Sequence, residues 1–295
     1  MQYIAFLIIY SVLWCISILP FPILYFISDF LYFILYKIIG YRVKTVRANL
    51  DLTLSHLSVE ERRKIERNFY KHFCDMFLEM AKTLTISPEE MQKRYVFKNI
   101  ALVHEYEKKN KSIILMTPHY ASWEWVIILG KYINFTGFGV YKKLKNKHFD
   151  QLVRDIRSRF DAHLISTKET IKAIKTNQQN NFPGIYLFLS DQTPLLRKGQ
   201  HWEPFMGIEV PVHMGAENLA RELDLNVLYL KVSKVKRGYY EAEFIEITDD
   251  IQNQPMYSVT QKFLHLVEEQ IIEKPDYYFW THKRWKHKGK KEETL

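Results

Sequence analysis

Residues 112–124 read SIILMTPHYASWE, and this stretch decides the fold class. Its first part, 112–117, is a short apolar run that is typical of a buried strand. Pro118 ends the run, and Ser122 is a favourable residue to begin a helix, so a helix is predicted over 120–131. A strand that leads directly into a helix is the repeating unit of α/β sheets.

The chain beyond residue 58 repeats this alternation. Further strands are predicted at 137–141, 184–190, 226–233 and 239–247. Further helices are predicted at 58–84, 146–160, 168–179, 213–223 and 256–273. A Lys-Arg-Gly turn separates the last two strands, which we interpret as a hairpin. The predicted fold class is α/β, with a mostly parallel or mixed central sheet flanked by helices and one antiparallel edge.

The amino-terminal segment carries a membrane signal. Residues 3–28 contain no charged side chain, and 4–19 is almost entirely apolar before Pro20 and Pro22 interrupt it. One interpretation is a transmembrane helix near 3–19 that ends at the prolines. The other is a helix that lies flat in the membrane interface, because Tyr and Trp are frequent in this segment.

The basic residues nearby indicate an orientation. A second apolar stretch, 23–39, carries only Asp29 and Lys37. Basic residues then follow the apolar region, at Lys37, Arg42, Lys44 and Arg47. The positive-inside tendency places the rest of the chain in the cytoplasm. We therefore predict a single amino-terminal membrane anchor at 1–40 and one catalytic domain at 41–295.

Composition restricts the partners of the protein. The formal net charge of +9 suits an acidic partner, such as phospholipid head groups, nucleic acid or an acidic carrier protein. The predicted anchor and the absence of a recognised motif argue against nucleic acid. Cys15 and Cys74 are too few for a disulfide framework or a zinc quartet, and both are interpreted as buried apolar residues. Neither a bound metal nor a cofactor is predicted.

His119 and Glu124 are the predicted catalytic residues. His119 follows the strand 112–117, and Glu124 stands five residues later in the first turn of the next helix. A carboxylate that accepts from one ring nitrogen of histidine fixes its tautomer, so the other nitrogen can take a proton from a hydroxyl. Helix N–H groups nearby can stabilise an oxyanion. The structural alternative is a histidine at a strand end and a favourable charge at a helix start.

Three arginines of the predicted helix 146–160 are candidate substrate ligands. Arg154 and Arg157 share one helical face, and Arg159 follows them. The guanidinium fork matches the oxygens of a phosphate group. The alternative is a solvated helix face on which these arginines pair with the neighbouring aspartates, Asp150, Asp155 and Asp161.

Four other polar residues are also assigned to substrate binding. Asp191 and Gln192 follow the predicted strand 184–190, where sites form in open sheets. Lys142 and Asn146 belong to the basic run KKLKNK at 142–147, which can attract an acidic carrier protein. The basic tail 282–291 can attract anionic lipid, although solubilising charge alone would account for both runs.

The order of these motifs resembles the late acyltransferases of lipid A biosynthesis, of the lauroyl and myristoyl type, within the wider lysophospholipid acyltransferase group. The similar blocks run through nearly the whole predicted catalytic domain. They are Arg47 with Asn49-Leu50, His119 to Glu124, Tyr141 to Asn146, the arginines 154, 157 and 159, Asp191-Gln192, Pro204 to Gly207, Ala216 with Leu219 to Arg221, and Pro275 to Lys286. The chain departs from the family pattern at Lys142, at Phe160-Asp161 and at His213 and Ala216, which leaves the acceptor and the acyl-chain preference open.

The resemblance implies a glycerolipid-acyltransferase-like fold and an enzyme of the inner membrane. It implies an acyl donor held as a thioester on acyl carrier protein, and a hydroxyl of a phosphorylated glycolipid as acceptor. His119 would be the general base and Glu124 its orienting carboxylate. No covalent acyl-enzyme is required, since the chain has no Gly-x-Ser-x-Gly motif. The alternatives are transfer to an aminolipid or a lysophospholipid, coenzyme A as donor, and hydrolysis of a lipid or thioester.

Overall fold

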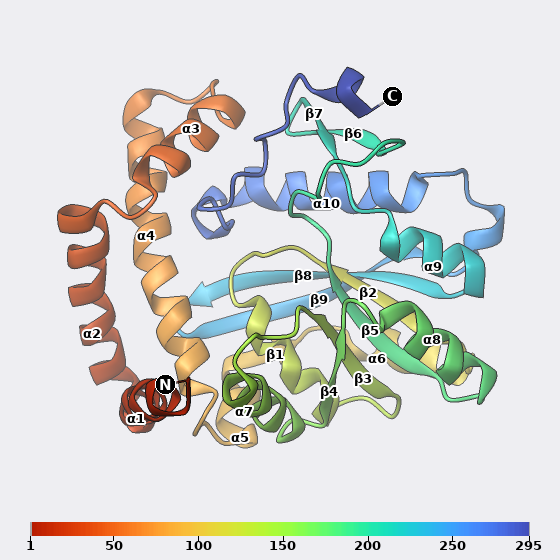
Figure 1. Ribbon diagram of the computed structural model, residues 1–295, viewed down its shortest axis with the longest axis horizontal. Helices are drawn as coiled ribbons and strands as arrows, with labels where there is room; N and C mark the ends of the chain where they lie inside the picture. Colours follow the sequence, from red (N-terminus) through yellow and green to blue (C-terminus); the bar gives the residue numbers. More distant parts are fainter. Residues whose placement is uncertain (1, 295) are drawn as a thin grey trace.

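The computed structural model describes residues 2–294 and contains one large sheet flanked by helices (Figure 1). The strands are β1 (Tyr95–Phe97), β2 (Ile113–Thr117), β3 (Thr136–Tyr141), β4 (Ala162–Ser166), β5 (Gly184–Leu189), β6 (Trp202–Phe205), β7 (Ile208–Pro211), β8 (Asn226–Lys236) and β9 (Tyr239–Thr248). The large sheet has the order β1-β9-β8-β2-β5-β3-β4, and β6 and β7 form a separate hairpin. Within the large sheet, only β8 and β9 pair antiparallel, which confirms the predicted α/β class.

The helices surround this sheet. They are α1 (Gln2–Ile18), α2 (Phe21–Tyr32), α3 (Val43–Thr53), α4 (Val59–Lys82), α5 (Pro88–Arg94), α6 (Ile100–Lys108), α7 (Lys147–Ser158), α8 (Thr170–Gln179), α9 (Gly215–Leu223) and α10 (Ser258–Glu273), with a π-helix η1 (Phe33–Ile39) and 3-10 helices η2 (Trp123–Lys131), η3 (Ile251–Asn253), η4 (Pro275–Tyr277) and η5 (Lys291–Thr294). The stretch predicted as a helix at 120–131 is therefore the 3-10 helix η2.

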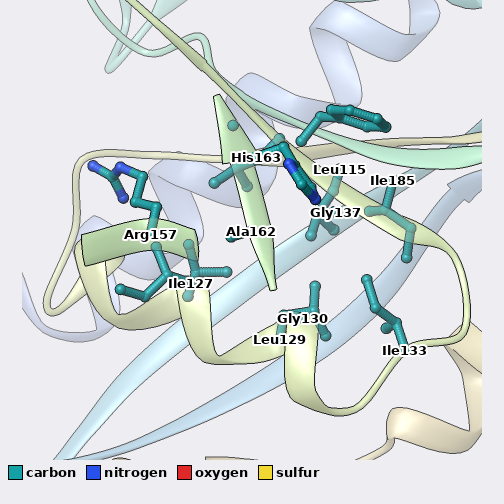
Figure 2. Close-up of a pocket in the computed structure, with 14 residues that line it drawn as sticks. Leu115, Ile127, Leu129, Gly130, Ile133, Gly137, Arg157, Ala162, His163 and Ile185 are labelled. Atoms are coloured by element: carbon teal, nitrogen blue, oxygen red, sulfur yellow. The ribbon is translucent and has the colours of Figure 1, made fainter. Parts of the chain in front are cut away.

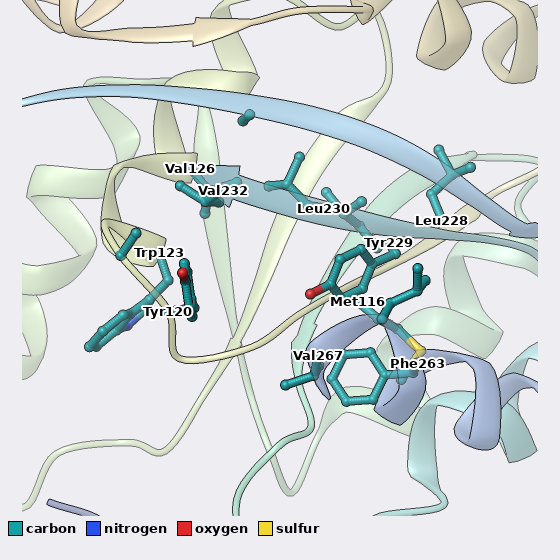
Figure 3. Close-up of a cluster of buried hydrophobic side chains, with 14 of the residues drawn as sticks. Met116, Tyr120, Trp123, Val126, Leu228, Tyr229, Leu230, Val232, Phe263 and Val267 are labelled. Carbon is teal, nitrogen blue, oxygen red and sulfur yellow. The ribbon is translucent and has the colours of Figure 1, made fainter. Parts of the chain in front are cut away.

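The central strands are buried because both faces of the sheet are covered. All five residues of β2 are buried, as its continuous apolar run predicts. On one side, Phe263 and Val267 of α10 pack near Met116 and Tyr229 (Figure 3). The rings of Tyr229 and Phe263 meet edge to face at 5.9 Å. This packing holds β2 rigidly, so the loop that follows it begins from a fixed point.

The margins of the sheet differ from the sequence prediction. The predicted hairpin of β8 and β9 forms, but β9 is not an edge strand, since β1 pairs with it in parallel. β1 has only three residues, and β4 has the sequence AHLIS with its first three residues incompletely buried. Strands this short or this polar carry no continuous apolar run, which is why the pattern did not predict them.

The amino-terminal apolar segment forms α1, followed after a short break by α2 and η1. α1 ends at Ile18 and α2 begins at Phe21, so the chain breaks at the prolines as expected. By length and composition alone, the helix that is long and apolar enough to cross a membrane is Phe21–Ile39, with a mean hydropathy of 1.6. Tyr3–Ile18 is a shorter apolar helix, and it covers the stretch in which a span near 3–19 is predicted.

Polar groups attach α2 and the η1 that follows it to α4, the helix beside which α2 lies in Figure 1. Tyr25 donates to Glu79 at 2.9 Å, Ser28 donates to Asp75 at 2.7 Å, and Tyr36 donates to Glu66 at 2.8 Å. The three acceptors are buried. One side of this apolar segment is therefore held against α4 by hydrogen bonds.

Asp75 is the centre of this attachment. Its carboxylate accepts from Ser28 and pairs with Arg237 at 2.7 Å and with Lys234 at 3.4 Å. Arg237 also pairs with Asp29 at 2.7 Å, but the Asp29 side chain is 58% exposed whereas that of Asp75 is 4% exposed. Arg237 thus has one buried partner, Asp75, and one exposed partner, Asp29, and the contribution of each to stability can be compared.

We expect Asp75→Ala to lower the free energy of unfolding by about 3–5 kcal/mol, because it leaves the buried ammonium of Lys234 without its carboxylate. Asp29→Ala is the control and should cost no more than about 1 kcal/mol, since its ion pair is exposed. Denaturant unfolding of both variants in detergent measures the difference. Equal losses in the two variants would show that the buried cluster does not hold α2 in place.

Candidate active site

The register of two parallel strands brings His119 and Asp191 together. β2 and β5 are neighbours, and their last residues, Thr117 and Leu189, are paired. Each site residue stands two positions beyond its strand end, at the carboxyl edge of the sheet. Nδ1 of His119 lies 2.7 Å from Oδ1 of Asp191. The carboxylate of Asp191 therefore orients the imidazole and leaves Nε2 for a substrate.

Asp191 is a buried carboxylate in a cationic and hydroxyl-bearing environment. Burial by itself raises the pKa of Asp191, but the charge and hydrogen bond of His119 outweigh it, and the net pKa is lowered. Arg284 is completely buried nearby, and the charge of Asp191 partly offsets the lowering of the Arg284 pKa that burial causes. Burial, followed by the charge of Asp191, raises the pKa of Tyr278 well above its ordinary value. Asp191 is thus held ionised.

The backbone around His119 is held by the carboxy-terminal segment. Phe279 N–H donates to the carbonyl of His119 at 3.2 Å, and Ala121 N–H donates to the carbonyl of Tyr277 at 3.0 Å. Ala121 has a φ of 48°, a left-handed conformation that an alanine adopts only where its surroundings impose it. The ring of His119 packs against Trp123 and Phe279, with centroids 5.3 and 6.1 Å away. These contacts fix the direction of the imidazole.

The predicted contact between His119 and Glu124 is not the one that forms. Glu124 lies in the first turn of η2, and its carboxylate pairs with Arg157 of α7 at 2.7 Å. The short connection after β2 holds its tight geometry at Ala121, and the Glu124 side chain is directed toward α7. Asp191 occupies the position beside the imidazole that the sequence had assigned to Glu124.

The other two predicted arginines make structural contacts. Arg154 pairs with Asp150 at 3.3 Å and donates to the hydroxyl of Tyr141, as the alternative of pairing within the helix predicted. Arg159 donates to three backbone carbonyls at and after the end of α4, those of Thr83, Leu84 and Ile86. Neither arginine is placed around the cleft described below.

Asn146 also has a structural position. It is the residue that precedes α7, and its side-chain oxygen accepts from the backbone N–H of His148 at 3.0 Å. This is a helix-capping contact, of the kind that asparagine supplies at a helix start. Its assignment to substrate binding came from the block Tyr141 to Asn146, which resembles a family motif, and such a motif does not distinguish a cap from a ligand.

A cleft of about 840 Å³ opens over His119, which is within the size range of small-molecule sites. Its lining includes the predicted residues Glu124, Lys142, Arg157 and Gln192 in addition to His119. Hydrophobic residues from β3, β5 and α9 form much of the remaining wall. A mixed wall of this kind suits a substrate with both polar and apolar parts.

Two further histidines near the site were not predicted. His213 lines the cleft, and burial lowers its pKa. Burial lowers the pKa of His282 to about 4, and the charge of Asp191 acts against this shift. Both therefore stay neutral near pH 7. The sequence indicated His282 only as part of the run Pro275 to Lys286, because no local pattern shows that this segment folds back onto β2.

The grouping of possible metal ligands and the exposure of the two cysteines can also be read from the structure. Among residues 2–294, no three side chains of His, Cys, Asp or Glu are grouped to hold a metal ion. Cys74 is buried as predicted, whereas Cys15 is exposed on α1, so its interpretation as a buried residue was wrong. Neither cysteine lines the cleft.

Two bacterial proteins are similar to this chain over nearly its full length, and a third over half of it. The lipid A biosynthesis palmitoleoyltransferase of Escherichia coli strain K12 is 21% identical over 97% of this chain and 92% of its own length. A lipid A biosynthesis acyltransferase of Shigella flexneri matches to the same extent. A second Shigella flexneri protein, lipid A biosynthesis acyltransferase 2, is 25% identical over half of the chain.

The family comparison covers the amino-terminal apolar region, the strand-end histidine and the carboxy-terminal segment together. Residues 1–287 match the family described as bacterial lipid A biosynthesis acyltransferase. This match includes every residue described above as lining the cleft or contacting His119. The chain therefore belongs to the bacterial lipid A biosynthesis acyltransferase family, and it is an acyltransferase.

Proposed function

We propose that this acyltransferase moves a fatty acyl chain from an acyl carrier protein thioester to a hydroxyl of a lipid A precursor, at the cytoplasmic face of the inner membrane. The observation that carries the proposal is the hydrogen-bonded pair of His119 and buried Asp191 at the cleft of about 840 Å³. A phosphorylated glycolipid fits a cleft with both apolar and cationic walls. The basic run 142–147, next to the cleft, suits an acidic carrier protein.

His119 acts as the general base in this mechanism. Nδ1–H donates to Asp191, so the unprotonated Nε2 takes the proton from the acceptor hydroxyl. The hydroxyl oxygen forms a bond to the thioester carbonyl carbon and makes a tetrahedral oxyanion. When this intermediate collapses, the carbon–sulfur bond breaks and the imidazolium returns its proton to the leaving sulfur. The ester and the free carrier thiol are the products, and no acyl-enzyme forms.

Two features of the cleft are proposed to stabilise the negative charge that develops on the oxyanion. The guanidinium of Arg157 and the first residues of η2, Trp123 and Glu124, line the cleft that contains His119. Positive charge and helix N–H groups stabilise an oxyanion in a site from which water is excluded. Glu124 holds Arg157 in position through their 2.7 Å ion pair, and Lys142 and Gln192 remain proposed substrate ligands.

The first proposed test is acyl transfer in detergent with labelled acyl carrier protein thioester and a panel of lipid acceptors. We expect a phosphorylated glycolipid to be acylated, and we expect His119→Ala to lower kcat by at least about 100-fold because the base is lost. Transfer to an aminolipid or a lysophospholipid would overturn the acceptor assignment. Release of free fatty acid without an acceptor would identify a hydrolase, and a preference for acyl-coenzyme A would overturn the donor.

A comparison of carboxylates tests the orienting residue. We expect Asp191→Asn to lower kcat by about 10²–10⁴-fold with little change in the KM of the acceptor, because the amide no longer stabilises the imidazolium. Glu124→Gln should cost less, since its partner is Arg157. Asp150→Asn is a control that removes a buried carboxylate paired with Arg154. A larger kcat loss in Glu124→Gln than in Asp191→Asn would restore the pairing predicted from sequence.

We also propose that residues 1–40 anchor the protein in the plane of the membrane. One side of Phe21–Ile39 is hydrogen-bonded to the charged helix α4, whereas Phe26 and Phe30 on the same segment are 76% and 61% exposed. If this segment crossed the bilayer, it would take the charged face of α4 with it, at a high free-energy cost. The geometry favours the interfacial alternative, with residues 41–295 as the cytoplasmic catalytic domain.

We expect the double variant Phe26→Glu/Phe30→Glu to bind vesicles of phosphatidylethanolamine and phosphatidylglycerol at least about 100-fold more weakly, because two phenylalanines lose apolar burial. Vesicle flotation measures the binding. The control is Val59→Glu/Ile272→Glu, which alters two exposed apolar residues elsewhere, and it should bind normally. A parent protein that resists extraction from vesicles by alkaline carbonate would show a spanning helix instead.

A further inference from the structure

A small apolar cavity lies beneath η2, between that helix and the sheet (Figure 2). Ile127, Leu129 and Ile133, on one side, face Leu115 and Ile185 of the central strands. The lining is mostly hydrophobic, and its two residues with titratable side chains are Arg157 and His163. Its volume is about 50 Å³, which is room for about four water-sized groups at ~10–15 Å³ each. Cavities with apolar walls stay dry and accept apolar guests.

This cavity adjoins the cleft that contains His119. Four residues line both spaces: Val126, Gly139, Arg157 and Leu187. Gly137 pairs with Ile185 and Gly139 with Leu187, so Gly137 and the neighbouring Ile133 lie farther from the carboxyl edge of the sheet that bears His119. A chain that starts at the reacting carbonyl beside His119 and passes Gly139 would finish against Gly137 and Ile133.

Two glycines of β3 leave space along the path from the cleft into the cavity. Gly137 and Gly139 are two residues apart, so both present the same face of the strand to η2. Glycine within a strand marks a place where another group approaches the backbone closely. A Cβ at Gly137 would lie 3.5 Å from Cδ1 of Ile133, an ordinary contact, so alanine fits there. A Cβ at Gly139 would lie 3.2 Å from Cδ2 of Leu164, which would have to move.

We propose that this cavity receives the distal carbons of the transferred acyl chain, and that Gly137 and Ile133 at its end set the accepted chain length. This inference rests on the proposed acyl transfer and names the residues that determine its specificity. An acyl chain is the part of either substrate whose chemistry matches a dry apolar wall. The shared residues make the cavity continuous with the site at which the thioester carbonyl must lie.

The test is a competition among acyl carrier protein donors that differ by two carbons, from eight to sixteen carbons in the acyl chain. The readout is the ratio of kcat/KM between adjacent donors, which is internal to each variant and insensitive to the fraction of folded enzyme. Each buried methylene contributes about fourfold. We expect Gly137→Ala to shift the ratio at least fourfold toward the shorter donor, and Ile133→Ala to shift it toward the longer donor.

The control is Ile272→Ala, which makes the same change as Ile133→Ala at an exposed position of α10 outside the cleft and the cavity. Its donor ratios should equal those of the parent. Parent-like ratios in both Gly137→Ala and Ile133→Ala would overturn the inference and leave the proposed function intact. A parent protein that transfers no acyl chain would instead overturn the proposed function.

A second measurement applies if a variant has no activity. Thioether analogues of the donors, whose chains cannot be transferred, are titrated against the variant and the parent. The chain length that gives the lowest Kd should become shorter in Gly137→Ala and longer in Ile133→Ala. An unchanged optimum in the folded variants would overturn the inference.

Discussion

The hydrogen bond between His119 and Asp191 is the constraint on which the rest of the site depends. A carboxylate as buried as Asp191 is costly unless it is paired and hydrogen-bonded. The pairing requires β2 and β5 to be neighbours in one register, so that the residues beyond Thr117 and Leu189 meet. It also requires the carboxy-terminal segment to return to the site, because Arg284 and Tyr278 surround the same carboxylate.

The return of this segment explains why Asn49, far away in the sequence, is buried. Asn49 of α3 is buried, and its side-chain amide donates to the carbonyls of Trp280 and His282 at 2.8 and 2.9 Å. Arg42 donates to the carbonyl of Thr281 at 3.0 Å. The region that follows the apolar helices therefore holds the loop that supports His119, so the attachment of α2 to α4 and the geometry of the active site belong to one connected structure.

Much of the fold could be predicted because its central elements carry strong local patterns. The apolar run 112–117 and the run 184–190 are strands buried on both faces, and they match β2 and β5 to within a residue or two. The weakly patterned edge strands β1 and β4 could not be predicted in this way. The apolar character of the amino terminus was also evident, but the position of its longer helix was not, because Pro20 starts α2 as readily as it ends α1.

By itself the sequence determined the α/β class and the placement of His119 and Asp191 at the ends of two buried strands, since both follow from local hydrophobic pattern. Only the tertiary structure decided that these two residues are partners, that Glu124 pairs with Arg157, and that Arg154, Arg159 and Asn146 support the fold around the cleft. The physical reason is that strand order and register are set by packing across the whole sheet. His119 and Glu124 are five residues apart in the chain and do not pair. His119 and Asp191 are 72 residues apart and do pair, because their strands are neighbours in the sheet.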